Sequence, residues 1–132
     1  MNLSETVQTA DWKAEKHAPM IDAPEEVAAG QTFTATAHLG AAIAHPNTPQ
    51  HHIAWMSLYF LPEGGKMAIQ LAHADFTAHA ASLSDQPGPA LTQPRMVADI
   101  QLSRSGTLQA LAYCNLHGLW QSAKPIRVTP AP

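Results

Sequence analysis

The amino-acid sequence predicts an all-β protein: an immunoglobulin-like antiparallel β-sandwich of about seven strands with an irregular N-terminal segment. Eleven prolines are scattered through the 132 residues, which argues against long helices. Short apolar or alternating segments recur along the chain with turn-forming residues between them, a pattern typical of sandwiches. At this length we expect residues 1–132 to form one domain with an ordinary hydrophobic core.

The first third of the chain contains one clear strand. Residues 1–30 are expected to be largely irregular, because Pro19 and Pro24 interrupt any periodic pattern. Residues 31–39 alternate and are rich in threonine, which predicts a strand. Residues 40–50 contain two prolines and are expected to form a loop.

The middle of the chain contains its most apolar segment. Residues 51–61 read as a central strand, and the Pro-Glu-Gly-Gly sequence at 62–65 predicts a hairpin turn after it. Residues 67–72 and 74–78 are expected to form two further short strands. Residues 82–94 contain three prolines and a glycine, which predicts a long exposed loop.

The last third of the chain is also expected to be strands. Residues 95–102 and 107–114 are predicted to pair as a hairpin around the turn at 103–106. Residues 123–128 form a last predicted strand, and residues 129–132 a frayed tail.

Composition excludes several classes of function. The formal net charge is −3, 13% of residues are charged, and no basic run or stripe is present, so we expect neither nucleic acid nor an anionic membrane as a partner. The first residues show no basic region followed by an apolar stretch, and no apolar run approaches membrane-spanning length. We therefore expect a soluble, cytoplasmic protein. A single cysteine permits no internal disulfide.

The chemistry of the chain centres on Cys114 and His117. A thiolate and an imidazole three residues apart can reach one metal ion across a tight turn. Thiolate is a soft ligand and imidazole a borderline one, so the pair suits iron, copper or zinc better than magnesium or calcium. A lone cysteine in an apolar setting is more often a small buried hydrophobic residue. The pair therefore predicts a metal site only if further ligands are available.

Further ligands are available, because the chain contains eight histidines. His17 lies in the irregular N-terminal segment, and His45 and His51 lie in or beside the proline-bounded loop. Loops cluster at the edges of a sandwich, so these side chains can converge with the cysteine turn. Four imidazoles and one thiolate would leave the sixth position of an octahedral iron site open, whereas structural zinc needs four ligands. Strand parity does not choose between His51 and His52 as the ligand.

These residues fall in blocks that resemble the superoxide reductases, specifically the one-iron neelaredoxin type, over nearly the whole chain. The blocks are residues 11–19 (DWKAEKHAP), 45–53 (HPNTPQHHI), 59–64 (YFLPEG), 76–79 (FTAH) and 114–120 (CNLHGLW). The resemblance implies one mononuclear non-heme iron that cycles between Fe2+ and Fe3+ and reduces superoxide to hydrogen peroxide. It also implies a small redox protein such as rubredoxin as electron donor, and a homo-oligomer, either a dimer or a tetramer.

The resemblance also assigns the ligands. It implies that His17, His45, His51 and His117 bind iron in one plane and that Cys114 binds opposite the open position. It implies that His117 uses Nδ1 and the other three histidines use Nε2. It selects His51 rather than His52.

Two charged residues beside His17 have expected roles, Lys16 from its positive charge and Glu15 from the same resemblance. Lys16 is expected to attract the superoxide anion and to orient water for proton delivery. Glu15 is expected to become the sixth ligand of the oxidised iron. Gln50 stands where the family often has glutamate, and no four-cysteine module precedes Glu15, so the likeness is to the one-iron proteins rather than to the two-iron desulfoferrodoxins.

Three alternative functions remain open at this point. A blue-copper electron carrier is also a sandwich with cysteine and histidine ligands, but such sites usually add a methionine, and none follows His117. A non-catalytic domain would hold zinc or no metal at the same residues. A dismutase would produce one peroxide for every two superoxide ions consumed, whereas a reductase produces one for each.

Overall fold

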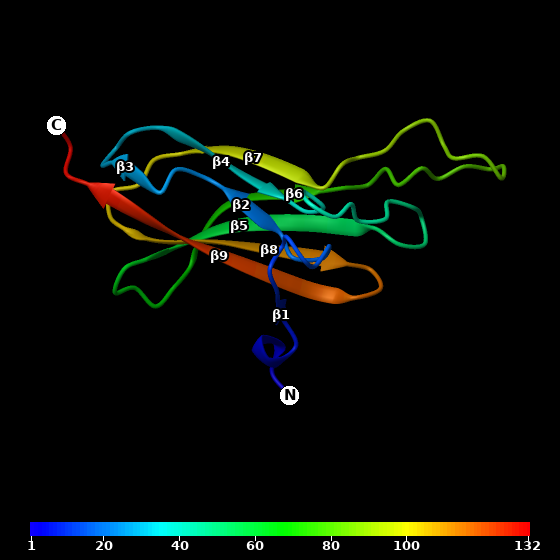
Figure 1. The fold of residues 1–132 in the computed structure, drawn as a ribbon, viewed down its shortest axis with the longest axis horizontal. Helices are drawn as coiled ribbons and strands as arrows, with labels where there is room; N and C mark the ends of the chain where they lie inside the picture. Colours follow the sequence, from blue (N-terminus) through cyan, green and yellow to red (C-terminus); the bar gives the residue numbers. More distant parts are fainter.

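The chain folds into two β-sheets packed face to face, and the structure, a computed structural model, describes residues 1–132 (Figure 1). One 3-10 turn, Leu3–Glu5, precedes the strands. The nine strands are β1 (Gln8–Thr9), β2 (Met20–Asp22), β3 (Glu26–Ala28), β4 (Phe33–His38), β5 (Ile53–Pro62), β6 (Ile69–Asp75), β7 (Arg95–Ile100), β8 (Gly106–Cys114) and β9 (Gly118–Thr129). The all-β prediction is confirmed, and no helix is long and apolar enough to cross a membrane.

The larger sheet has the strand order β1-β9-β8-β5-β6, and β3 pairs with another part of β9. The smaller sheet has the order β2-β4-β7. The long strands all pair antiparallel, while the short strands β1 and β3 run parallel to β9. The centre of the larger sheet is therefore the ladder between β5 and β8, which runs from Pro62–Gly106 to Ile53–Cys114.

The core lies between the sheets and follows from the alternation of the long strands. From β5 it receives Met56 and Leu58, and from β8 it receives Leu108, each at most 1% exposed. Opposite them, β4 contributes Ala35 and Ala37, which have no exposed surface. Full burial of a leucine- or methionine-sized side chain contributes about 1.5–3 kcal/mol, so these strands are held together mainly by their inward faces.

The strands predicted over residues 31–39, 51–61 and 123–128 are confirmed as β4, β5 and β9, although β9 begins already at Gly118. The expected turn after β5 and the long exposed loop after β6 are also present. Residues 67–78 contain one strand, β6, rather than two, because pairing with β5 continues past Ala72 to Asp75.

The predicted hairpin of residues 95–102 with 107–114 is wrong. Strand β7 pairs with β4 in the smaller sheet, whereas both edges of β8 are occupied by β5 and β9. The connection between β7 and β8 therefore crosses from one sheet to the other, with Leu102 buried on the way. Alternation in the sequence reports that two segments are strands but not that they are partners.

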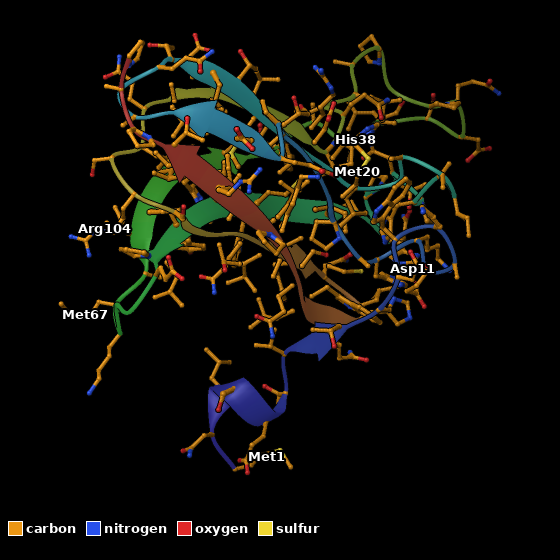
Figure 2. The ribbon with its side chains drawn as sticks, turned by 60° about the vertical axis from the view of Figure 1, so that its left-hand side comes forward. Met1, Asp11, Met20, His38, Met67 and Arg104 are labelled. Carbon is orange, nitrogen blue, oxygen red and sulfur yellow. The ribbon has the colours of Figure 1, made fainter.

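The N-terminal 30 residues are less irregular than predicted, because they contain three short strands. Pairing of β1 and β3 with β9, and of β2 with β4, supplies their backbone hydrogen bonds. A strand of two or three residues is too short to show periodicity in the sequence. These strands form because their residues pair with the edges of the longer strands β4 and β9. Figure 2 shows Met1 at the far end of this segment and Met67 on the β5–β6 turn, both projecting away from the core.

Three connections lie at one end of the sandwich (Figure 1). They are the loop at residues 40–52, the long loop between β6 and β7, and the turn between β8 and β9. This end therefore contains the loop with His45 and His51 and the turn with His117.

Candidate metal centre

Cys114 is the last residue of β8 and lies at the end of the sandwich where the three connections meet. Only 1% of its surface is exposed. Residues 115–117 form the turn that leads into β9, and Cys114 pairs with Gly118 across it. Gly118 has a φ of +80°, the left-handed conformation that commonly closes three-residue hairpin turns. The turn brings Nδ1 of His117 to 3.7 Å from Sγ of Cys114.

His17 reaches the same place from the segment between β1 and β2. Its side chain is buried, and Oε1 of Glu15 accepts hydrogen bonds from its backbone N–H at 3.0 Å and from Nδ1 at 2.7 Å. Because Nδ1 donates to the carboxylate, Nε2 carries the free lone pair. That Nε2 lies 3.1 Å from Nδ1 of His117.

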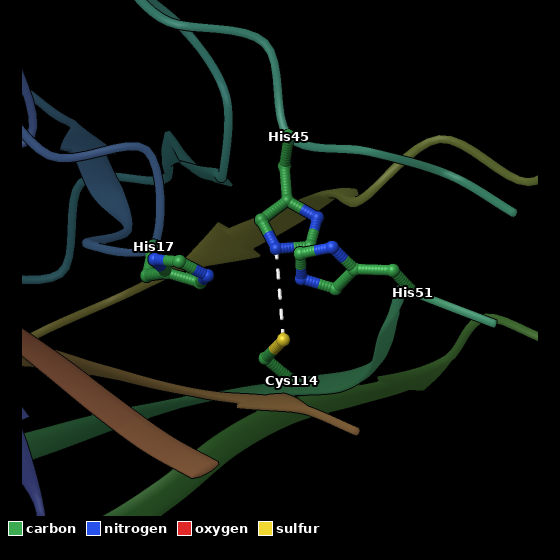
Figure 3. Close-up of side chains that lie close together, drawn as sticks. All are labelled: His17, His45, His51 and Cys114. Carbon is green, nitrogen blue, oxygen red and sulfur yellow. Dashed lines mark hydrogen bonds between the residues drawn. The ribbon is translucent and has the colours of Figure 1, made fainter. Parts of the chain in front are cut away.

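His45 and His51 approach from the loop at residues 40–52. Nδ1 of His45 donates to the carbonyl oxygen of Pro46 at 2.7 Å, which leaves Nε2 facing Sγ of Cys114 at 3.6 Å. Nε2 of His51 lies 3.2 Å from Nδ1 of His117. Figure 3 shows the rings of His17, His45 and His51 gathered on one side of the sulfur of Cys114.

The spacing of these atoms fits a single ion. One potential ligand atom from each of His17, His45, His51 and Cys114 lies within 4.8 Å of all the others. Two nitrogen ligands at right angles, each about 2.1 Å from an ion as imidazole is from zinc, lie about 3.0 Å apart. The distances of 3.1 and 3.2 Å from His117 to His17 and His51 match this value. The inward nitrogens are also those that the family resemblance implies.

The protonation states suit metal binding, which needs neutral imidazole. Burial lowers the pKa of His45 from the usual 6.5 to about 4, against a smaller upward effect of its bond to Pro46. Burial also lowers the pKa of His17, although the Glu15 carboxylate partly opposes this shift. Burial, followed by the charges of neighbouring histidines, lowers the pKa of His51.

Lys16 and Glu15 lie beside the cluster without belonging to its inner atoms. Lys16 is half-buried, and its positive charge contributes to the lowered pKa values of His17, His45 and His51. The hydrogen bonds from His17 lower the pKa of Glu15 and hold its carboxylate on Nδ1, on the side of the imidazole away from the other donors.

Trp120 supports two of the predicted ligands at once. Its ring stacks on His17 with centroids 5.0 Å apart and an interplanar angle of 17°. Its indole N–H donates to the carbonyl oxygen of His117 at 3.1 Å. Trp120 therefore packs against one predicted ligand and holds the backbone of another.

His79 has no partner motif in the sequence, which gives it no role as a ligand, and the structure shows a supporting contact for it. It is 9% exposed, and its two ring nitrogens contact the carbonyl oxygen of Phe76 and Oδ1 of Asn47, each at 2.8 Å. Asn47 lies between His45 and His51, so His79 anchors their loop to the chain after β6. The one available signal is its place in the 76–79 block that carries the resemblance.

His52 does not join the cluster. Its Nδ1 donates to the carbonyl oxygen of Thr48 at 2.9 Å, and its ring stacks on His79 with centroids 3.7 Å apart. Both His51 and His52 precede β5, which begins at Ile53, so strand alternation does not decide which one turns inward. The structure brings His51 to the other donors, as the family resemblance selects.

Comparison with known proteins identifies the relatives of the chain. The desulfoferrodoxin family matches residues 9–123. Neelaredoxin from Megalodesulfovibrio gigas is 42% identical over 127 residues, covering 96% of this chain and 98% of that protein. Superoxide reductase from Pyrococcus horikoshii is 44% identical over 120 residues, covering 91% and 95%. The solved structure of reduced superoxide reductase (neelaredoxin) from Archaeoglobus fulgidus has a TM-score of 0.82 at 42% identity, covering 92% of this chain and 98% of that one.

We predict that the metal-free protein loses stability as the pH falls from 6.5 towards 4. In this interval the unfolded chain takes up a proton at His45 that the folded chain does not, so the free energy of unfolding decreases on acidification. Urea unfolding of the unmodified chain and of His45→Gln between pH 4 and 7 measures the effect. The variant should show a shallower pH dependence. His73→Gln, on strand β6 outside the cluster, serves as the matched control, and equal slopes in all three proteins would contradict the prediction.

Proposed function

The chain belongs to the desulfoferrodoxin family, and on this premise we propose that it is a superoxide reductase with one iron ion at the histidine and cysteine cluster. The proposed ligands are His17, His45, His51, Cys114 and His117. The observation that carries the proposal is that His17, His45, His51 and Cys114, from three separate segments, present ligand atoms within 4.8 Å of one another. Nδ1 of His117 adds a fifth donor at 3.1, 3.2 and 3.7 Å from the ligand atoms of His17, His51 and Cys114. The reaction consumes one superoxide ion, one electron and two protons and yields hydrogen peroxide.

When bound, iron supplies the one-electron couple between the ferrous and ferric states. The protein supplies the surroundings. Glu15 and the carbonyl oxygen of Pro46 hold Nδ1–H of His17 and His45, so that each Nε2 faces inward. Outer partners of this kind orient ligands and raise their basicity. Cys114 offers a buried sulfur, where a thiolate is shielded from water.

The number and type of donors favour this function over the alternatives. Blue-copper sites use two histidines, one cysteine and a weak axial ligand, which would leave two of the four histidines without a role. Structural zinc would likewise leave one of the five donors surplus. Peroxide yield separates a reductase from a dismutase: with an external electron donor, one peroxide per superoxide supports the proposal, and one per two superoxide ions contradicts it.

We predict that the ferrous protein, loaded without oxygen, turns from colourless to blue when superoxide is added. The colour would arise from charge transfer between the thiolate of Cys114 and ferric iron, so Cys114→Ser should bind iron and stay colourless. Visible absorption spectra with parallel iron analysis measure both properties. Ser57→Ala, a substitution in β5 that changes no proposed ligand, is the control for handling. A blue Cys114→Ser protein would remove the thiolate from the ligand set.

Lys16 is proposed to steer superoxide, because it is the half-buried cation whose charge reaches three of the histidines. Lys16→Ala should slow the bimolecular reaction several-fold at low salt and flatten its dependence on ionic strength. Pulse radiolysis or stopped flow at several salt concentrations measures both. Lys66→Ala, on the exposed β5–β6 turn, removes the same charge elsewhere and should change neither by as much. An unchanged rate and salt slope in Lys16→Ala would exclude the steering role.

Glu15 is proposed to become the sixth iron ligand after oxidation, and its hydrogen bonds to His17 define what that requires. The carboxylate would have to leave both bonds. Glu15→Gln keeps an oxygen acceptor for His17 and removes the charged ligand, whereas Glu15→Ala removes both. Altered visible and electron paramagnetic resonance spectra of the oxidised protein in both variants are expected. If only Glu15→Ala alters them, the residue orients His17 and does not bind iron.

Further properties are proposed on the same premise. Residues 1–132 form a single domain, which limited proteolysis tests. Reduction requires an electron donor, proposed to be a small redox protein such as rubredoxin, and the rate of reduction of the oxidised protein should rise with donor concentration.

A dimer or tetramer is proposed because Trp55, Tyr59 and Tyr113 are only half-buried on the outer face of the larger sheet; light scattering tests it. The cytoplasm is proposed because a ligating thiolate must stay reduced, and cell fractionation tests it.

A further inference from the structure

Asn115 lies within the turn between Cys114 and His117, and its side chain bonds to both neighbours of His51. Its Oδ1 accepts a hydrogen bond from the backbone N–H of His52 at 2.8 Å. Its Nδ2 donates to the backbone carbonyl oxygen of Gln50 at 2.9 Å. We propose that Asn115 is a positioning residue that holds His51 at the correct distance from Cys114 and His117. This inference rests on the proposed ligand set.

The contacts of Asn115 extend the ladder between β5 and β8 past the ends of the strands. The last residue pair of that ladder is Ile53 with Cys114. One residue further, the backbone N–H of Asn115 donates to the carbonyl oxygen of His52 at 3.2 Å. The side-chain amide of Asn115 then donates to the carbonyl oxygen of Gln50, the residue that precedes His51. The backbone on both sides of His51 is therefore tied to the residue next to Cys114.

An asparagine amide suits this task because it is both donor and acceptor in one plane. Gln50 presents a carbonyl oxygen and His52 presents an N–H, so the two partners need opposite groups. Aspartate would keep the acceptor for His52 but place an oxygen against the oxygen of Gln50. Alanine would lose both bonds and leave these backbone groups to water.

The other anchors of the loop do not replace Asn115. Asn47 bonds to the carbonyl oxygen of Thr92 and to His79, and thus ties the His45 side of the loop to the chain after β6. Thr48 bonds to the backbone of His51 within the loop itself. Neither residue bonds to the turn at 115–117. The side-chain hydrogen bonds from the turn to the backbone on either side of His51 therefore come from Asn115, and their loss should affect His51 more than His45.

A double-mutant cycle on the full metal-free chain tests this role, with Co2+ as the probe. Competition against a chelator measures Co2+ affinity, and the visible spectrum of the cobalt protein reports ligand geometry. Asn115→Ala should weaken Co2+ binding at least tenfold and alter the spectrum, as loss of an outer partner of a ligand typically does. In a His51→Ala background, Asn115→Ala should change the affinity by less than about twofold, because the residue through which it acts is gone. In a His45→Ala background its effect should persist.

The outcomes distinguish an error in the proposed ligand set from an error in the positioning role of Asn115. If His51→Ala leaves Co2+ affinity unchanged, the proposed ligand set is wrong. If His51→Ala weakens binding but Asn115→Ala does not, or weakens it equally with and without His51, the positioning role is wrong and Asn115 merely stabilises the fold. Circular dichroism checks the fold of each metal-free variant. Should Asn115→Ala fail to fold, Asn115→Asp replaces it in the same cycle, with a smaller loss of affinity expected and the same contradiction if the loss does not depend on His51.

Discussion

The ladder between β5 and β8 is the constraint on which the site depends. Its register ends with Ile53 opposite Cys114, and that pair determines where the sulfur lies and where both adjoining loops begin. His51 precedes Ile53 by two residues, and His117 follows Cys114 by three. A slip of one residue would turn Cys114 from the core to the outer face of the sheet, because side chains alternate along a strand. Three of the five proposed donor residues, His51, Cys114 and His117, are thus positioned from one register.

Removing an imidazole from water would be unfavourable without a hydrogen-bond partner, and the structure provides one for the outward nitrogen of His17 and of His45. Glu15 accepts from His17 and the carbonyl oxygen of Pro46 accepts from His45. These bonds fix the tautomers and leave the unprotonated nitrogens facing one another. Desolvation lowers the pKa of each of these imidazoles, so both are neutral at physiological pH. The arrangement therefore favours a cation at the centre over protons on the rings.

Much of the fold could be predicted from the sequence, because strands and turns leave local patterns. The alternation of β4, the apolar run of β5 and the glycine turn after it are visible directly. Partners were harder to predict: β7 and β8 are neighbours in sequence but belong to different sheets. Alternation records which residues are buried, whereas pairing depends on which edges other strands already occupy.

The sequence by itself determined the chemistry of this protein: one thiolate, an excess of imidazoles, and the three-residue spacing of Cys114 and His117 that requires a tight turn. Only the tertiary structure decided which contacts bring His17 to them, turn His51 inward while His52 stacks on His79, and link the two loops through Asn115. The reason is physical. Ligand type and turn geometry are local properties, whereas contacts between residues 63 to 100 positions apart exist only once the sheets have paired.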